Sequence, residues 1–428
     1  MVFSENNSGA EAPPPRSIAV VGASHAAVHL ADRLRSEGYR GEITLISQEP
    51  HLPYQRPPLS KAWLKGAATE ESVLLREPAY YADQRIELLT GTRVEHVERT
   101  DDGVVVRFSG EDGASSRRFD RLVLATGARA RRPALPGSEH PDVLVLRDLD
   151  HARSLAERVQ AGPIVVIGGG FIGLEVAATA RALGAQVTVV EAGERLLGRA
   201  VGEPTAHTLL TAHRAMATDV VLGAMPTEIV HDETGVRGVR LADGREIPAA
   251  TVLLGVGAEP RTELAEQLGV ECDGGVVVDE RCLASDSWTL AIGDCTVHVS
   301  SAGGRYRLES VDNAVEQANA AAAVLLGKPL PQRPTPWFWS DQGDQKLQIV
   351  GLMGGHTSVL LRIDPDKPRR RVALYFADDV LIAAECLNSP ADFLALRTAF
   401  GRGRRPGPDE LSDVTVPLKK LLLTSVAS

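Results

Sequence analysis

The sequence predicts an α/β protein in which two parallel-sheet domains share one pattern and a smaller α+β domain follows. Three features of the 428 residues lead to this prediction. A strand, a glycine turn, a helix and a second strand fit residues 164–191, a related pattern fits residues 17–47, and a mixed strand pattern begins at Trp337. A repeated βαβ unit of this kind is typical of two Rossmann-like, dinucleotide-binding domains in one chain.

The later of the two patterns has the spacing of a dinucleotide-binding turn. Gly168, Gly170 and Gly173 follow a short apolar run with G-x-G-x-x-G spacing. The first glycine makes the tight turn, the second lets backbone amides approach a pyrophosphate, and the third lets the helix pack on the strand. A glycine-rich turn in some other α/β protein is the alternative interpretation.

An acidic residue strengthens the prediction. Glu191 ends the second strand, near the offset of ~20 residues at which a carboxylate binds a ribose diol. Because a carboxylate repels a 2′-phosphate, NADH is predicted over NADPH, although Arg195 and Arg199 nearby leave this preference open. The residues predicted to bind the nicotinamide nucleotide are Gly168, Gly169, Gly170, Phe171, Ile172, Gly173, Glu175, Glu191, Arg199 and Gly257.

The earlier pattern carries a degraded form of the same turn. Gly22 keeps the first glycine place, whereas Ser24 and Ala27 stand in the second and third. Small side chains still permit close approach to a nucleotide. After the second strand come Gln48 and Glu49, of which only Glu49 offers a carboxylate to a ribose.

Three further features each allow two interpretations. His25 either lies near a bound ring or packs on the turn at the start of its helix. Asp294 follows a strand and a glycine, so it either grips a polyol hydroxyl at the start of the next helix or serves as a plain N-cap. Lys61 follows a proline-rich run that either fixes its position or forms an ordinary loop with a solvated lysine.

Turn and linker signals give the expected domain boundaries. Residues 1–15 read as a disordered lead-in, residues 16–136 and 258–330 as the first domain, residues 137–257 as a second domain inserted in it, and residues 331–428 as a C-terminal interface domain. Asp102-Gly103 and Asp112-Gly113 are hairpin signals. An alanine-rich helix is expected over residues 311–326, and a tail begins at Val414.

Composition excludes several function classes. The 46 basic and 56 acidic residues give a formal charge of −10, which argues against unspecific binding to nucleic acid or to an anionic membrane. The 4 cysteines form neither a disulfide framework nor a metal-ligand cluster, so no metal is expected and a reducing compartment fits best. Without a signal peptide or an apolar run of ~20 residues, a cytoplasmic location is expected.

Six motifs together resemble the FAD-dependent, NADH-linked ferredoxin reductases that serve bacterial cytochrome P450s and Rieske oxygenases. They are, in order, PYQRPPLSKAWL, LVLATGAR, VVIGGGFIGLEVAATA, LAIGDC, ESVDNAVEQA and PWFWSDQ. The resemblance covers residues 16–420 and implies that the first domain binds FAD and that the inserted domain binds NAD. The implied FAD-binding residues are Gly22, Ser24, His25, Ala26, Gln48, Glu49, Arg56, Lys61, Val94, Ala125, Thr126, Gly127, Arg129, Gly293, Asp294, Glu309, Ser310 and Val311. The sequence departs from the family pattern at Gln48, where the family has its ribose-binding acid, and at the altered glycine turn.

The reaction that the resemblance implies is hydride transfer from NADH to the flavin, followed by two single-electron steps to a [2Fe–2S] ferredoxin. Lys61, paired with Glu175, is expected near the flavin edge, where a cation stabilises the reduced ring. Trp339 is expected to stack on the flavin or the nicotinamide, with a core tryptophan as the alternative. Because the first nucleotide motif is not followed by a C-x-x-x-x-C pair, electrons are expected to pass directly to an external carrier.

An acidic carrier would need a local basic surface. Six arginines are candidates for it, although most arginine runs are merely solvated: Arg369, Arg370, Arg371, Arg402, Arg404 and Arg405. A monomer or a weak dimer is expected. A rubredoxin reductase, a monodehydroascorbate-type reductase and a redox-switched interaction protein like apoptosis-inducing factor remain as alternatives.

Overall fold

The computed structural model describes residues 14–111, 113–299 and 304–423, which form two compact units. Unit 1 contains the described residues up to Tyr54, Leu74–Ala128 and Pro260–Arg333. Unit 2 contains Gln55–Val73, Arg129–Glu259 and the described residues from Pro334. The predicted disorder of residues 1–13 and the turn residue Asp112 lie outside the described residues. The units differ from the expected boundaries, because unit 2 groups Gln55–Val73, residues 129–136 and the C-terminal part with the inserted domain.

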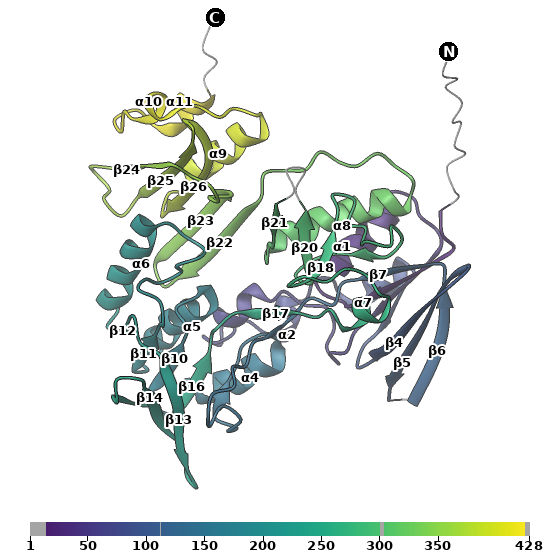
Figure 1. Cartoon of the computed structure of the whole chain (residues 1–428), viewed down its shortest axis with the longest axis horizontal. Helices are drawn as coiled ribbons and strands as arrows, with labels where there is room; N and C mark the ends of the chain where they lie inside the picture. Colours follow the sequence, from purple (N-terminus) through teal and green to yellow (C-terminus); the bar gives the residue numbers. More distant parts are fainter. Residues whose placement is uncertain (1–13, 112, 300–303, 424–428) are drawn as a thin grey trace, which may run out of the picture. The chain divides into compact units, whose positions relative to one another are not determined.

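Unit 1 is built on a parallel sheet of five strands in the order β19-β7-β1-β2-β3, of which β7 is labelled in Figure 1. Its strands are β1 (Ser17–Val21), β2 (Glu42–Ile46), β3 (Ile86–Leu89), β7 (Arg121–Leu124) and β19 (Leu290–Ala291). Ile18 and Val20 face a core that α1 (His25–Ser36) and α8 (Val311–Leu325) complete. The short apolar strand, the glycine turn and the alanine-rich helix therefore form the predicted layer of helix on sheet.

The other face of this sheet packs on antiparallel strands. Ala19 and Val21 share a second core with β4 (Arg93–Thr100), β5 (Gly103–Gly110) and β6 (Gly113–Phe119). The Asp102-Gly103 hairpin signal is confirmed, since β5 begins at Gly103. Unit 1 also holds α3 (Pro78–Asp83), α7 (Glu263–Gln267), β18 (Val276–Val278), β20 (Thr296–Val299) and β21 (Arg305–Tyr306).

The nucleotide-type sheet of unit 2 confirms the second predicted βαβ pattern. Five parallel strands stand in the order β12-β11-β10-β16-β9, and they are β9 (Val143–Leu144), β10 (Ile164–Ile167), β11 (Val187–Val190), β12 (Asp219–Val221) and β16 (Thr251–Leu254). Its helices are α4 (Leu149–Arg158), α5 (Phe171–Ala182) and α6 (Glu203–Ala215). The predicted hairpin is β13 (Pro226–Asp232) with β14 (Gly235–Leu241), and β15 (Glu246–Pro248) adds a third strand.

The C-terminal part of unit 2 is an antiparallel sheet in the order β22-β23-β26-β25-β24. Its strands are β22 (Trp337–Gln342), β23 (Gln345–Gly351), β24 (Ser358–Ile363), β25 (Arg371–Ala377) and β26 (Val380–Leu387). Helices α9 (Pro390–Gly401), α10 (Pro408–Leu411) and α11 (Leu418–Leu423) follow it, so the expected tail contains a helix whose leucines join the core. The short elements η1 (Pro57–Ser60) and α2 (Glu70–Val73) also belong to unit 2.

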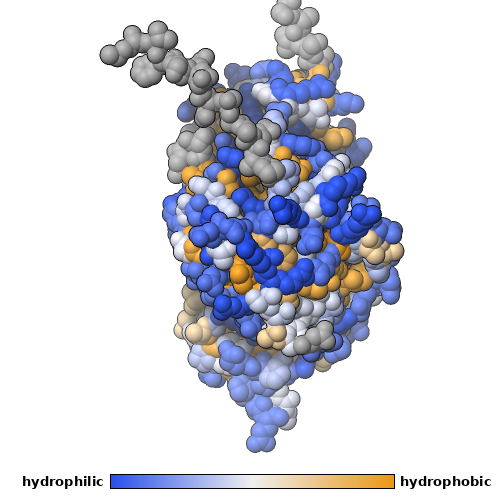
Figure 2. All heavy atoms as spheres, turned by 90° about the vertical axis from the view of Figure 1, so that its right-hand side faces the viewer, coloured by the Kyte–Doolittle hydropathy of each residue, from blue (hydrophilic) through white to orange (hydrophobic). Residues whose placement is uncertain are grey.

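Two short strands mark two of the places where the chain passes between the units. These are β8 (Ala128–Ala130) and β17 (Ala258–Pro260), which pair as a two-stranded sheet. The fold is thus the predicted α/β arrangement, with one nucleotide-type domain inserted in another and a C-terminal α+β part. On the face shown in Figure 2, hydrophilic residues predominate and hydrophobic ones form small groups, in agreement with the charged composition. Among the described residues, none of the helices has the length and apolar character needed to cross a membrane.

Candidate functional site

The glycine turn between β10 and α5 divides its tasks as the spacing predicts. Gly168 has φ +105°, and a Cβ there would lie 2.5 Å from the carbonyl oxygen of Gly255. A Cβ at Gly173 would lie 2.5 Å from the carbonyl oxygen of Gly168, so this glycine allows the helix to pack on the turn. At Gly170 a Cβ would come no closer than 3.6 Å to its neighbours, which leaves space for an incoming group.

Glu191 is held directly beside this turn. Its Oε2 accepts a hydrogen bond of 2.7 Å from the amide of Gly169, and its Oε1 accepts one of 2.7 Å from the amide of Gly193. The amide of Leu197 in turn donates to the carbonyl oxygen of Gly169 at 3.0 Å. The predicted ribose-binding carboxylate and the predicted phosphate-binding turn are therefore one connected structure.

The helix ends at the two glycine turns fit the binding of phosphate groups. Within the described residues, no side chain caps α1 at Ser24 or α5 at Gly170, and neither helix has an acidic residue in its first turn. By contrast, Asp148 caps α4 and Ser310 caps α8 through hydrogen bonds to backbone amides. Amides at a helix N-terminus, together with the helix dipole, attract anions. The chain thus offers one such N-terminus in each unit to a dinucleotide pyrophosphate.

The turn after β1 is as tight as the second turn in spite of its altered sequence. Gly22 has φ +114°, and a Cβ there would lie 2.1 Å from the carbonyl oxygen of Ala125. A Cβ at Gly293 would lie 3.2 Å from the Cβ of Ala26. Four predicted FAD-binding positions therefore meet at the carboxyl ends of the parallel strands, where nucleotides bind in such sheets.

The residues that follow β2 have partners of their own. Gln48 accepts a hydrogen bond of 3.1 Å from the guanidinium of Arg261, and Glu49 accepts one from the hydroxyl of Tyr54. The carbonyl oxygen of Arg261 also accepts from the hydroxyl of Thr126 at 2.8 Å. Which of Gln48 and Glu49 binds the ribose stays a prediction.

One expectation about Asp294 is wrong. Asp294 lies in a turn before strand β20, so no helix begins there for it to cap. The amide of Gly293 beside it donates to Gln317 Oε1 of α8 at 2.6 Å, because the chain turns back toward that helix. A carboxylate on such a turn is still able to accept a polyol hydroxyl, and this role stays a prediction.

The remaining predicted FAD positions are spread over several elements. In unit 1, His25 and Ala26 are buried in the first turn of α1, and Val94 is half-buried on β4. Gly127 has φ +65°. Glu309 pairs with Arg307, and Val311 begins α8. In unit 2, the Arg56 guanidinium donates to the carbonyl oxygen of Arg147 at 2.7 Å, and Arg129 pairs with Glu259 at 3.2 Å. Also in unit 2, Gly257 has φ +99°, while Ile172 and Arg199 are exposed.

Unit 2 brings Lys61 and Glu175 together. Lys61 Nζ lies 2.5 Å from Glu175 Oε2, and the side chain of Glu175 is only 7% exposed. The hydroxyl of Ser60 donates to the same carboxylate oxygen at 2.5 Å, and that of Ser340 donates to Oε1 at 2.7 Å. Three donors from two chain segments therefore surround one buried carboxylate, which satisfies its oxygens.

This arrangement continues into the interior of unit 2. Gln342 Nε2 donates to the hydroxyl of Ser340 at 3.2 Å, and Gln342 Oε1 lies 3.0 Å from His213 Nε2. Since an amide oxygen only accepts, His213 carries its proton on Nε2. Burial lowers the pKa of His213, which favours the neutral ring. Ser60, Ser340, Gln342 and His213 were not among the predicted residues, although both serines stand inside the family motifs that contain Lys61 and Trp339.

Trp339 lies on β22 in a group of aromatic rings. Its ring stacks on that of Trp337 at 5.3 Å between centroids, and Phe338 contacts Phe171 of α5 with centroids 4.6 Å apart. Trp339 is half-buried rather than a core residue. One part of its ring surface thus remains open to a second aromatic partner.

The cysteines are poor candidates for dithiol chemistry. All four are free thiols, and Cys282, Cys295 and Cys386 are buried. Burial raises the pKa of Cys272 to about 11, and it raises the pKa values of the three buried thiols. Since the thiolate is the reactive form, these side chains are held in their unreactive state at neutral pH.

Most of the six candidate docking arginines have partners inside unit 2. Arg369 pairs with Asp344, Arg404 pairs with Glu410, and Arg405 lies over the ring of Phe400. Arg371 donates to the hydroxyl of Thr208 at 3.2 Å. Arg370 and Arg402 have exposed side chains. The basic surface is therefore smaller than the number of arginines suggests.

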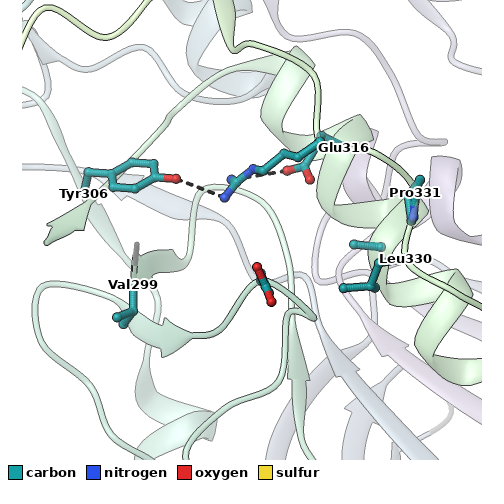
Figure 3. A pocket seen from close by; sticks show the side chains of 8 residues that line it. Val299, Tyr306, Glu316, Leu330 and Pro331 are labelled. Carbon is teal, nitrogen blue, oxygen red and sulfur yellow. Dashed lines mark hydrogen bonds and ion pairs between the residues drawn. The ribbon is translucent and has the colours of Figure 1, made fainter. Parts of the chain in front are cut away.

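Unit 1 also has a hollow of about 370 Å³ away from the predicted residues. It is lined by Glu280, Val299, Tyr306, Glu316, Ala320, Leu330, Pro331 and Arg333. In Figure 3, dashed lines join Tyr306 and Glu316 to the guanidinium between them, which is that of Arg333. None of the lining residues is a predicted site residue.

Comparison with known proteins agrees with these features. Residues 16–318 match the family described as pyridine nucleotide-disulphide oxidoreductase, and residues 337–422 match the family described as reductase C-terminal. Rhodocoxin reductase from Rhodococcus erythropolis is 38% identical over 415 residues, which cover 94% of this chain and 93% of that protein.

Two solved structures are similar over nearly their whole length. The ferredoxin reductase for the CYP199A2 system from Rhodopseudomonas palustris is 39% identical with a TM-score of 0.89, covering 95% of this chain and 100% of that chain. The reductase in the covalent complex of putidaredoxin reductase with putidaredoxin is 35% identical with a TM-score of 0.90, covering 96% of this chain and 99% of that chain.

Proposed function

Since the chain belongs to the pyridine nucleotide-disulphide oxidoreductase family, and within it to the ferredoxin reductases, we propose that it is an FAD-dependent NADH:ferredoxin oxidoreductase. The observation that carries this proposal is the presence of two tight nucleotide turns, each leading into an uncapped helix, in one chain. When bound, FAD accepts a hydride from NADH and passes two electrons singly to an iron–sulfur carrier.

The side chains of this protein have binding and orienting roles in that reaction. The amides at the start of α5 hold the NADH pyrophosphate, and Glu191 accepts the ribose hydroxyls while it repels a 2′-phosphate. Glu175 keeps the ammonium of Lys61 in place, and that positive charge stabilises the reduced flavin. Trp339 offers an aromatic face for stacking and limits the entry of water.

The electron acceptor is a [2Fe–2S] ferredoxin that feeds a cytochrome P450 or a Rieske oxygenase. This part of the proposal draws on the names of the similar reductases. The unreactive state of the four thiols supports it, because electrons then leave without a dithiol step. The four free thiols also support a proposed cytoplasmic location, since free thiols persist in a reducing compartment.

The proposal is tested with purified protein and defined acceptors. Mixed with NADH under argon, the protein should lose its yellow colour in a single fast phase, and it should then reduce cytochrome c only when a [2Fe–2S] ferredoxin is added. Rubredoxin and an ascorbyl radical source serve as the comparison acceptors. Faster turnover with either of these, or a flavin that NADH does not bleach, would contradict the proposal.

Two variants test the assigned roles. Lys61→Met should slow flavin reduction by NADH and lower the flavin midpoint potential, because the reduced ring loses a nearby cation. Trp339→Ala should weaken the charge-transfer band that forms with NADH. If either variant behaves like the unchanged protein in stopped-flow reduction, that residue has no such role.

A basic docking surface would make the reaction sensitive to salt. Ferredoxin-dependent reduction of cytochrome c should slow as salt is added, because screening weakens attraction to an acidic carrier. Arg369, Arg370 and Arg402 have exposed side chains, and Arg369 pairs with Asp344, so Arg370→Ala and Arg402→Ala should each reduce the salt dependence. Unchanged salt dependence in both variants would place docking elsewhere.

A further inference from the structure

A buried carboxylate of the C-terminal sheet binds the loop that follows Glu191. Glu385 lies on β26 and is 1% exposed. Its Oε1 accepts a hydrogen bond of 2.9 Å from the amide of Gly202, and its Oε2 accepts one of 2.7 Å from the hydroxyl of Tyr375 on β25. A buried carboxylate is costly unless its oxygens are paired, so this cluster has a defined geometry.

Glu385 binds a backbone amide at the N-terminus of helix α6. Gly202 is the N-cap residue of α6 and has no side chain with which to bind the free amides of the first turn. A carboxylate at this end of a helix also interacts favourably with the helix dipole. The contact is close, because a Cβ on Gly202 would lie 2.1 Å from the hydroxyl oxygen of Tyr375. A glycine therefore allows the end of the loop to approach the C-terminal sheet.

The loop fixed in this way forms part of the predicted NADH site. It runs from Glu191, which binds the amide of Gly169, to Gly202. Arg195 stiffens it by donating to the carbonyl oxygens of Gly198 at 2.6 Å and Val201 at 2.7 Å. The loop is thus held at one end by the glycine turn and at the other end by Glu385.

We propose that Glu385 is a positioning residue for the adenosine end of the NADH site, acting through the loop from Glu191 to Gly202. Glu385 does not touch the nucleotide, since it is buried among Tyr375 and the start of α6. The C-terminal sheet thereby contributes to coenzyme binding, in addition to Ser340 at the Lys61 and Glu175 pair. This inference rests on the proposed use of NADH. Binding of ADP-ribose, however, is measured without electron transfer to any acceptor.

The test compares KM, kcat and the affinity for ADP-ribose, a probe of the adenosine end. Glu385→Leu removes the acceptor of the Gly202 amide, so the loop is no longer fixed at this end, and a hydrogen bond of this kind is worth about tenfold in an equilibrium constant. We expect KM for NADH and the Kd of ADP-ribose to rise about tenfold, with kcat at saturating NADH within about twofold, because uniform binding is what is lost. Glu385→Gln keeps an oxygen acceptor and should restore most of the affinity.

The control separates positioning from general damage to the sheet. Val372 is 3% exposed on β25, so Val372→Ala should lower Tm by leaving a cavity while KM stays unchanged. Gly202→Ala moves the same end of the loop with the carboxylate intact and should also raise the Kd of ADP-ribose. If both Glu385→Leu and Gly202→Ala bind ADP-ribose as tightly as Val372→Ala does, the inference is wrong. Failure to reduce any ferredoxin would overturn the proposed function but not this result.

Discussion

The ammonium nitrogen of Lys61 lies 2.5 Å from a carboxylate oxygen of Glu175, 114 positions along the chain. The contact joins the end of the proline-rich turn η1 to the buried face of α5. The side chain of Lys61 is 20% exposed and that of Glu175 is 7% exposed, so the pair is largely removed from water. Removal of one partner should therefore lower the stability of the protein more than removal of both charges.

Lys61→Met should lower the free energy of unfolding by about 3 kcal/mol, because it leaves a buried carboxylate without its cation. The double variant Lys61→Met with Glu175→Gln should be more stable than Lys61→Met alone. Urea unfolding of the holoprotein measures both differences. A double variant whose loss of stability equals the sum of the losses in Lys61→Met and Glu175→Gln would show that the pair contributes no coupling of this kind.

Two alanine substitutions in one turn should have different effects, one on stability and the other on NADH binding. Gly173→Ala should destabilise the protein by about 2 kcal/mol or more, because its Cβ would lie 2.5 Å from the carbonyl oxygen of Gly168. Gly170→Ala should leave Tm nearly unchanged, since its nearest neighbour would be 3.6 Å away, and it should still weaken NADH binding by blocking the pyrophosphate. Thermal unfolding and KM together separate the two. Equal effects of both variants on Tm would contradict this division of tasks.

Glu191→Ala should raise KM for NADH by about tenfold or more and reduce the preference for NADH over NADPH. In the proposed function, this carboxylate both binds the ribose diol and repels a 2′-phosphate. Glu194→Ala is the matched control, because Glu194 is an exposed carboxylate of the same loop. Steady-state kinetics with both coenzymes provide the measurement. A similar change in both variants would indicate only an effect of net charge.

His298 should make the stability of the protein dependent on pH. Burial, and then the charge of Arg333, lower the pKa of His298 from 6.5 to about 4. Between these two pH values the unfolded chain binds a proton that the folded chain does not. The stability that His298 contributes is therefore fully present above pH 6.5 and falls as the pH decreases toward 4. The loss from this group amounts to about 3 kcal/mol at most.

The variant His298→Gln tests this effect. An amide is able to replace both hydrogen bonds of the ring, to Asn313 at 2.9 Å and from Arg333 at 3.0 Å, and it does not titrate. Its Tm should fall less than that of the unchanged protein between pH 7.5 and pH 5. If the two proteins lose the same Tm over this range, His298 does not contribute to the acid sensitivity.

Sequence patterns identified most of the nucleotide-binding framework because that framework is local. The places of Gly168 and Gly173 follow from the distance between one strand end and the next helix, and the short apolar strand before each turn fits only the interior of a sheet. The placement of Asp294 failed for a local reason as well, since a strand and a glycine precede a helix or a second strand equally well. In the folded chain a strand follows, because β20 pairs with β18 and the amide of Gly293 donates to Gln317.

The sequence by itself determined the two βαβ turns and the resemblance to ferredoxin reductases, and it predicted Glu191 as the ribose-binding carboxylate, because these depend on residues close together in the chain. The tertiary structure alone decided what supports them. Ser340 and Glu385 come from strands of the C-terminal sheet, and they reach Glu175 and Gly202 only after the chain has folded back on itself. Such long-range hydrogen bonds have no periodicity or spacing, since their partners are set by the packing of buried surfaces rather than by the order of residues.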